Sequence, residues 1–562
     1  MTTYRSRTLW GTARLNVQRL LHPGVATTDP PEHMVFERDV AVPVRDGTVL
    51  RANVFRPEGG GRHPVLLSAQ PYGKDALPKR TRRGGYRTPL QYRLAANDEP
   101  LTRSAWTGLE APDPAYWVPR GYVVVLVDLR GWGTSAGAPE PFGLGEGDDV
   151  HDAVEWAAAQ PWSTGRVGMN GVSYLAISQW SGAATRPPHL AAICPWEGMT
   201  DPYPDFGYPG GVRENGFLPL WSTWLKVMRP RSPSFRRAQH AHPLRDGWWT
   251  DRAADLERID VPALVCASFT DQGLHSRGSF EGFRRIGSSQ KWLWAHRGPK
   301  WAPYYSAAGL ALQSRFFDHF LRDEDTGILD DPPVRLEVRS SLHEVAEVRT
   351  AQEWPPREVR PTVLHLDAGT GTLSDVAPAA PGKVEVGRGG ARFAWTLPER
   401  LDLVGPMRLR VTISTERDDL TLMPVVRKFH GDREVVFEGA YGFTEDVVTR
   451  GWLRASHRGV DETRSSAWEA FHPHTSTLPV VPGRPVDLDL TLLPSATRFA
   501  AGDTLVLELR DSYVFPANPL TGQFPAVFGA TPRQRWRVHT GSAATSTLTV
   551  GVWADHTVED AA

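Results

Sequence analysis

The chain has 562 residues, of which 40% are hydrophobic and 23% are charged, and its formal net charge is −1. This length predicts two or three domains, and the composition is that of an ordinary globular protein. The balanced charge gives no indication of a nucleic-acid or membrane-surface partner. Because no apolar run of about 18 residues is present, we expect no transmembrane helix and no membrane partner.

The cysteines and histidines bear on compartment and metal binding. Cys194 and Cys266 are the two cysteines, and both lie in apolar runs that read as buried strands. We expect free core thiols rather than a disulfide, and therefore a cytoplasmic protein. Residues 1–31 have no apolar segment of the kind a secretory signal needs. The histidines show no metal-ligand spacing and no Cys-x-x-Cys occurs, so neither a metal nor a cofactor is expected.

The first part of the chain alternates strand and helix patterns. Residues 37–43 and 48–55 alternate apolar and polar side chains around a turn, which predicts a hairpin. Residues 63–69 and 121–127 are apolar runs of the kind found in buried parallel strands. Residues 149–160 show helical spacing.

A serine follows at a sharp change of pattern. Residues 165–169 predict a short buried strand, residues 174–183 predict a helix, and Ser173 lies between them with Gly171 two residues before it. In such a strand–turn–helix unit the serine hydroxyl points away from the backbone and beside the helix N-terminus, as a catalytic nucleophile requires. The alternative is that Ser173 serves only as a turn or N-cap residue.

An aromatic and proline-rich stretch interrupts the alternation at residues 198–258. An insertion at this point covers the edge of the sheet that carries the nucleophile, so we interpret it as a helical cap lining an apolar substrate pocket. The alternative is a packed helical appendage without substrate contact.

The sheet pattern resumes after the insertion and supplies the other members of a triad. A strand over residues 261–268 leads to Asp271, and a strand over residues 291–295 leads to His296. The order serine, acid, histidine is that of an α/β-hydrolase. His275 is the competing histidine, but it precedes a predicted helix (276–286) rather than following a strand. We therefore favour His296 as the base.

From residue 332 onward the pattern is all-β. Short alternating strands are separated by turns without helical spacing, which predicts a jelly-roll sandwich. The predicted domains are an N-terminal arm (1–34), an α/β-hydrolase domain (35–197 and 259–331), a cap (198–258) and a β-sandwich (332–562).

The assembled motifs resemble those of the CocE/NonD family of serine hydrolases, which is related to the X-prolyl dipeptidyl peptidases. The resemblance spans about residues 35–552. It rests on the opening hairpin, a Pro-Tyr-x-Lys turn, the "D.RG.G.S.G" segment, the nucleophile region and the entry to the β-domain, which are residues 42–57, 71–74, 128–137, 152–174 and 316–333.

The resemblance implies specific roles. Ser173 would be the nucleophile, Asp271 the acid and His296 the base, while the Tyr72 hydroxyl and the Tyr174 backbone N–H would hold the oxyanion. Two departures stand out. Ala176 replaces the glycine usual three residues after the nucleophile, and the family's Gly-Pro-Trp-x-His motif is absent around residues 294–301.

We therefore expect a two-step acyl transfer from a small-molecule ester or amide to water. One alternative is an X-prolyl dipeptidyl aminopeptidase, which needs cap carboxylates to hold a substrate ammonium. Another is a non-catalytic glycan- or ligand-binding protein built on the β-sandwich. The physiological substrate and the oligomeric state stay open, with a homo-oligomer as one alternative.

Overall fold

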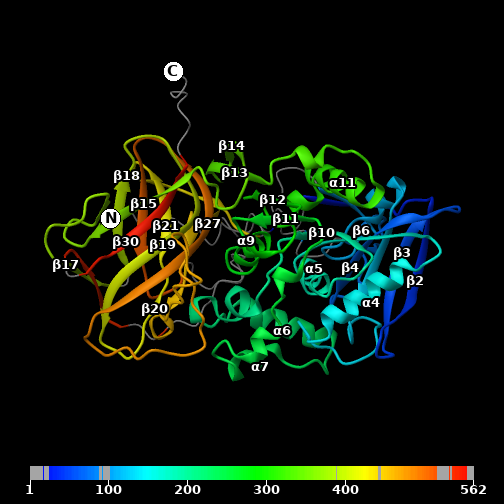
Figure 1. Ribbon diagram of the computed structural model, residues 1–562, viewed down its shortest axis with the longest axis horizontal. Helices are drawn as coiled ribbons and strands as arrows, with labels where there is room; N and C mark the ends of the chain where they lie inside the picture. The colour runs from blue at the N-terminus through cyan, green and yellow to red at the C-terminus, as the bar shows by residue number, and fades with distance from the viewer. Residues whose placement is uncertain are drawn as a thin grey trace, which may run out of the picture.

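The computed structural model describes residues 24–87, 101–387, 389–440, 445–514, 534–542 and 544–553, and single residues at 17, 92 and 531. Most of the predicted N-terminal arm lies outside these residues. The described chain forms an α/β body that carries the N-terminal half and a β-sandwich that carries the C-terminal half, side by side (Figure 1).

A mixed sheet forms the centre of the α/β body. Only its first strands are antiparallel, with β2 pairing β3 and β3 pairing β8, and every later pairing in the row is parallel. In spatial order the strands are β2 (Met34–Pro43), β3 (Val49–Pro57), β8 (Val123–Asp128), β4 (His63–Gln70), β9 (Ser163–Val172), β10 (Leu190–Trp196), β11 (Ala263–Ser268), β12 (Lys291–His296) and β13 (Val334–Ser341).

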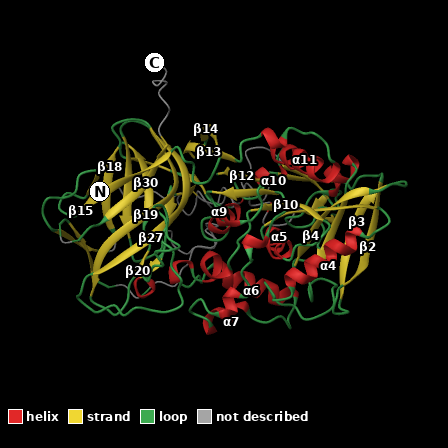
Figure 2. Ribbon diagram, viewed as in Figure 1, coloured by secondary structure: helices red, strands yellow, loops and turns green. Residues whose placement is uncertain are grey.

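Helices cover both faces of this sheet (Figure 2). Neighbouring residues of β9 show the two faces. A Cβ at Gly168 would lie 2.8 Å from Phe317 of α11, whereas the sulfur of Met169 lies beside Gly182 of α5. Both faces of this part of β9 are therefore closed to water, and every residue from Val167 to Val172 is buried. The helices of this layer are α3 (Pro114–Trp117), η1 (Val118–Arg120), α4 (Glu146–Ala158), α5 (Tyr174–Ala184), α9 (Ser276–Arg285), α10 (Ala302–Tyr305), α11 (Ala307–Arg322) and η5 (Ile328–Asp330).

The insertion after β10 is helical, as predicted, but its helices are short. They pack through aromatic side chains against the loop that contains Phe142, which stacks on Trp221 with ring centroids 5.5 Å apart. The helices are η2 (Tyr203–Gly207), η3 (Pro209–Gly211), α6 (Phe217–Met228), α7 (Phe235–Ala241), α8 (Gly247–Thr250) and η4 (Leu256–Arg258).

The C-terminal half is an all-β sandwich, which confirms the predicted fold class. Its own hydrophobic core is formed by inward-facing side chains such as Leu409, Leu490 and Leu507. The strands are β14 (Glu344–Ala351), β15 (Val359–Asp367), β16 (Thr372–Ser374), β17 (Gly382–Val386), β18 (Ala391–Thr396), β19 (Leu401–Thr415), β21 (Val425–His430), β22 (Arg433–Val435), β25 (Thr449–Arg450), β27 (Val486–Phe499), β28 (Asp503–Leu509), β29 (Trp536–Thr540) and β30 (Thr547–Trp553), and η6 (Ala455–His457) lies between β25 and β27.

Short two-stranded ladders complete the described structure. They are β1 (Val25–Thr28) with β7 (Leu101–Ser104), β5 (Lys79–Arg80) with β6 (Tyr86–Arg87), β20 (Thr421–Leu422) with β26 (Leu453–Arg454), and β23 (Phe437–Glu438) with β24 (Glu445–Asp446).

One strand belongs to both halves. The start of β13 pairs in parallel with β12, with Leu293 opposite Val334. Farther along, Arg339 of β13 pairs with Thr497 of β27 in the sandwich. The sheet of the α/β body therefore continues into the sandwich, and the sequence boundary near residue 331 falls just before the strand that joins them.

Candidate active site

The turn between β9 and α5 holds Ser173 in a strained conformation. Ser173 has φ 62° and ψ −118°, a region that L-residues other than glycine rarely adopt. Its backbone N–H donates to Trp196 O at 3.0 Å, which ties the turn to the end of β10. Gly171 has φ 149°, and a Cβ there would lie 2.5 Å from the Cβ of Leu175. The structure thus forms the sharp strand-to-helix turn that the sequence predicts.

Ala176, the departure from the family's glycine, is accommodated by a second glycine. A Cβ placed on Gly198 would lie 2.7 Å from the Cβ of Ala176, closer than such atoms approach in proteins. The methyl group of Ala176 therefore occupies space that is open because Gly198, just after β10, has no side chain.

His275 is the histidine that lies against Ser173. Its Nε2 is 3.0 Å from Ser173 Oγ. His275 is the N-cap residue of α9 and is 1% exposed, so the loop after β11 carries it across the end of β10 to Ser173. The backbone N–H of Met199 donates to His275 Nδ1 at 3.2 Å. Because Nδ1 accepts this bond, the neutral ring carries its proton at Nε2 and donates to Ser173 in the structure.

His296 does not reach Ser173, which corrects the placement favoured from the sequence. It is the last residue of β12 and pairs with Ser268 of β11. Its Nε2 is 3.3 Å from Glu197 Oε1, and its Nδ1 accepts from Gly298 N at 3.2 Å. Three strand spacings separate β12 from β9, which amounts to roughly 14 Å. Because His296 is the last residue of β12 and does not lie in the loop beyond it, its side chain cannot bridge that distance.

The carboxylate of Asp271 binds a lysine rather than a histidine. Lys300 Nζ lies 3.0 Å from Asp271 Oδ2, and both side chains are 1% exposed. Burial raises the pKa of Asp271, and the charge of Lys300 opposes that rise. The Asp271 carbonyl oxygen, not its carboxylate, accepts the backbone N–H of His275. Asp271 and His275 are thus joined by a backbone hydrogen bond, but their side chains are not bonded to each other.

Burial and the nearby ammonium also act on His275 and Glu110. Burial first, and then the charge of Lys300, hold the pKa of His275 well below its ordinary value. Glu110 is buried beside the nucleophile strand, where its carbonyl accepts the N–H of Val172. Burial raises the pKa of Glu110 to about 7, against the opposing charge of Lys300. The site therefore contains a neutral imidazole at His275 and, at Glu110, a carboxyl group whose pKa is about 7.

The two predicted oxyanion residues contact each other at the start of α5. Tyr174 is the first residue of α5, where backbone N–H groups have no acceptor within the helix. Its ring is 6.1 Å from that of Tyr72 between centroids, and Tyr72 is 9% exposed. The hydroxyl of Tyr174 donates to Glu146 Oε2 and accepts from Phe142 N, both at 2.8 Å. Those two bonds fix the start of the helix and leave the Tyr174 side chain itself fully engaged.

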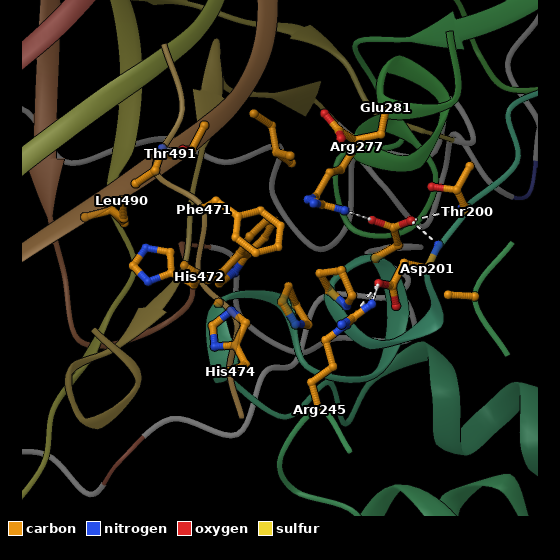
Figure 3. Close-up of a pocket in the computed structure, with 18 of the residues that line it drawn as sticks. Thr200, Asp201, Arg245, Arg277, Glu281, Phe471, His472, His474, Leu490 and Thr491 are labelled. Atoms are coloured by element: carbon orange, nitrogen blue, oxygen red, sulfur yellow. Dashed lines mark hydrogen bonds and ion pairs between the residues drawn. The ribbon is translucent and has the colours of Figure 1, made fainter. Parts of the chain in front are cut away.

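A separate cavity of about 190 Å³ lies between the cap, α9 and the sandwich, and Ser173 does not line it. In Figure 3, Arg277 and Arg245 face Phe471, His472 and His474 across this cavity. Two of its arginines are already paired, since Arg277 binds Asp205 at 2.7 Å and Arg245 binds Asp201 at 2.8 Å. We therefore place the candidate active site at Ser173, where the chemically competent groups meet.

Within the described residues, no group of three or more His, Cys, Asp or Glu side chains is arranged to hold a metal ion. The same part of the chain has no helix that is long and apolar enough to span a membrane.

The layered parallel sheet and the strained serine turn beside a histidine define the chain as an α/β-hydrolase with an appended β-sandwich. Residues 46–233 match the family model of X-Pro dipeptidyl-peptidase (S15 family). Residues 326–549 match the model of the X-Pro dipeptidyl-peptidase C-terminal non-catalytic domain.

A CocE/NonD family hydrolase from Staphylococcus aureus is similar in structure, with 34% identity, a TM-score of 0.87, and 92% of this chain and 94% of that chain covered. The chain belongs to the CocE/NonD family of hydrolases. It is also 29% identical to a putative serine esterase of Mycobacterium bovis, over 86% of this chain and 92% of the relative. It is 26% identical to a cocaine esterase of Rhodococcus, of which it spans 64% of the length, over 60% of this chain.

We predict that Gly198→Ala destabilises the protein by about 1–3 kcal/mol, because the new methyl overlaps the Ala176 methyl. Ala176→Gly in the same chain removes the closest contact and recovers part of the loss, since Trp180 Nε1 still lies 3.1 Å from the added carbon. Denaturant unfolding of the two single variants and the double variant measures this coupling. Strictly additive effects would contradict the assigned contact.

Proposed function

We propose that the protein is a serine esterase that forms an acyl-enzyme at Ser173, with His275 as the proton acceptor. The observation that carries this proposal is the 3.0 Å contact between Ser173 Oγ and His275 Nε2, at a strained strand-to-helix turn. A serine hydroxyl becomes an effective nucleophile only when an adjacent base takes its proton. His275 is the neighbour that meets this geometric requirement.

The ring of His275 must change tautomer before it accepts that proton. The N–H of Met199 favours the form with the proton at Nε2, whereas proton acceptance needs an unprotonated Nε2 and a proton at Nδ1. In this mechanism Met199 releases Nδ1 when the ring changes tautomer. His275 then takes the proton of Ser173 as the hydroxyl attacks the ester carbonyl, and returns it to the leaving alcohol.

We assign Asp271 to Lys300 and not to His275, which makes the reacting unit a dyad. The supporting observation is the buried ion pair of Asp271 with Lys300 at 3.0 Å. The Asp271 carboxylate binds the Lys300 ammonium, and no hydrogen bond joins it to the imidazole of His275. The charge of Lys300 lowers the pKa of His275 further than burial alone does, which favours the neutral ring between turnovers.

The oxyanion of the tetrahedral intermediate would lie at the start of α5. The backbone N–H of Tyr174 is one proposed donor, supported by its position directly after Ser173. The Tyr72 hydroxyl is the second, supported by the contact between the rings of Tyr72 and Tyr174. Both roles stay predictions.

The cap carboxylates favour an esterase over a dipeptidyl aminopeptidase, because each is already engaged. Asp201 and Asp205 bind Arg245 and Arg277. Glu197 lies against His296 and also accepts a hydrogen bond from Ser268. The carboxylate of Glu214 accepts the first backbone N–H groups of α6. A substrate ammonium would have to compete with these partners, whereas an uncharged ester has no such requirement.

We predict that the protein hydrolyses short nitrophenyl esters and that Ser173→Ala abolishes this activity and the labelling by a fluorophosphonate probe. Xaa-Pro anilides, tested in parallel, should be turned over much more slowly. Labelling that persists in Ser173→Ala would remove Ser173 as the nucleophile. Faster cleavage of the anilides than of the esters would reverse the choice between esterase and peptidase.

We predict that His275→Gln lowers kcat by ~10³-fold or more, because serine and base act as a unit. The matched variant His296→Gln should stay within about tenfold, since His296 contacts Glu197 and not the nucleophile. A depressed His275 pKa keeps the base unprotonated in mild acid, so the acid limb of kcat/KM should lie below pH ~6.5. Greater damage from His296→Gln would restore the sequence-based assignment.

A double-mutant cycle at Asp271 and Lys300 tests whether Ser173 and His275 act as a dyad without Asp271. Asp271→Asn alone removes the carboxylate that the buried Lys300 ammonium binds, which should cost about 3–5 kcal/mol of stability. We predict that the double variant Asp271→Asn with Lys300→Met regains stability and keeps kcat within about tenfold of the parent. If Asp271 instead orients His275, the double variant should lose kcat by up to ~10⁴-fold, as when a triad acid is replaced by its amide.

A further inference from the structure

The outer face of cap helix α6 is apolar and exposed. Leu220, Trp224 and Val227 are 51%, 40% and 74% exposed. They are spaced i, i+4 and i+7, so they lie along one side of the helix. The opposite side, with Leu218, Trp221 and Leu225, is buried against the rest of the cap. A surface helix normally exposes polar residues, so this second apolar stripe is unusual and indicates a contact surface.

The stripe lies in a stretch of the cap whose charged residues are all basic. Residues 215–245 contain Lys226 and five arginines but no aspartate or glutamate. Lys226, Arg231, Arg236 and Arg237 are exposed. Within the part of the chain that the structure describes, these four side chains form no ion pair, whereas Arg245 binds Asp201. The net charge of −1 for the whole chain conceals this local excess.

The basic segment and the stripe belong to one surface. Arg236 and Arg237 are in the first turn of α7, which follows α6 after a short loop. In Figure 1 α7 lies at the lower edge of the molecule with α6 just above it. The stripe also leads toward the active site, because the ring of Trp224 is 5.1 Å from that of Tyr72 between centroids.

We propose that this face of the cap adsorbs to an anionic lipid surface. An apolar helix face that includes a tryptophan enters the boundary between headgroups and acyl chains, while flanking cations bind the lipid phosphates. A second copy of the chain fits less well, because a two-fold contact through α6 would bring the same cations together. This proposal concerns binding and holds whether or not the protein is an esterase.

The test uses the full chain with Ser173→Ala, so that lipid hydrolysis cannot change the vesicles. Co-sedimentation with equimolar phosphatidylcholine and phosphatidylglycerol should show binding that weakens with salt, and pure phosphatidylcholine should bind at least about tenfold less. Leu220→Ser with Val227→Ser, and separately Arg236→Glu with Arg237→Glu, should each weaken binding to the anionic vesicles by about tenfold or more.

Matched controls change similar groups elsewhere. Leu329→Ser alters an exposed leucine of η5, and Arg433→Glu with Arg484→Glu reverses exposed arginines of the sandwich. These should bind like the parent. Circular dichroism of every variant checks folding, and hydrolysis of a water-soluble ester, measured with Ser173 restored, should be unchanged in the cap variants.

Several results would overturn the proposal. One is absence of vesicle binding at low salt, and another is equal binding by cap and control variants. Sedimentation that shows a dimer lost in Leu220→Ser with Val227→Ser would assign the stripe to a second copy instead. Salt-sensitive binding of RNA without binding of vesicles would assign the basic residues to a polyanion other than lipid.

Discussion

The backbone conformation at Ser173 is the constraint on which the rest of the site depends. A φ of 62° at a serine is unfavourable and persists only because β9, α5 and the end of β10 hold it from several sides. Gly171 and Gly198 lack side chains where these elements approach most closely. The result is a hydroxyl held beside a helix N-terminus, within reach of whatever the loop after β11 presents. Here that loop presents His275.

The fold followed from the sequence because its signals are local and repeated. The apolar runs of β4 and β8, the helical spacing of α4 and the alternation in the sandwich each reflect burial along one element. The histidine that contacts Ser173 was not the one chosen from the sequence, because chain order does not reveal whether a histidine stays in its strand or lies in a crossing loop. His296 ends inside β12, while His275, four residues after Asp271, spans the gap. The close approach of Gly198 to Ala176 was missed for a similar reason. It joins two separate segments, and the pattern of residues within either segment does not reveal it.

Charge shows the same limit on a larger scale. A net charge of −1 is an average over the chain, and it masks both a buried cluster and a basic surface. Near Ser173, the charge of Lys300 opposes the rise that burial causes in the pKa of Asp271 and adds to the fall that burial causes in the pKa of His275. On the cap, residues 215–245 hold Lys226 and five arginines and no carboxylate, although Glu214 and Asp246 border this stretch. Composition alone predicts neither arrangement, because each depends on which residues folding brings together.

The strand β13 has a consequence for how the two halves of the molecule depend on each other. Its first residues complete the parallel sheet beside β12, and Arg339 farther along joins β27. Arg297, which follows β12, donates to the carbonyl oxygens of Val447 and Val448 in the sandwich. A chain cut before Val334 would leave the backbone groups of β12 exposed as an open edge and the Arg297 guanidinium without those acceptors. The sandwich is thus a structural completion of the hydrolase sheet, and the two halves are expected to lose their structure as a single cooperative unit.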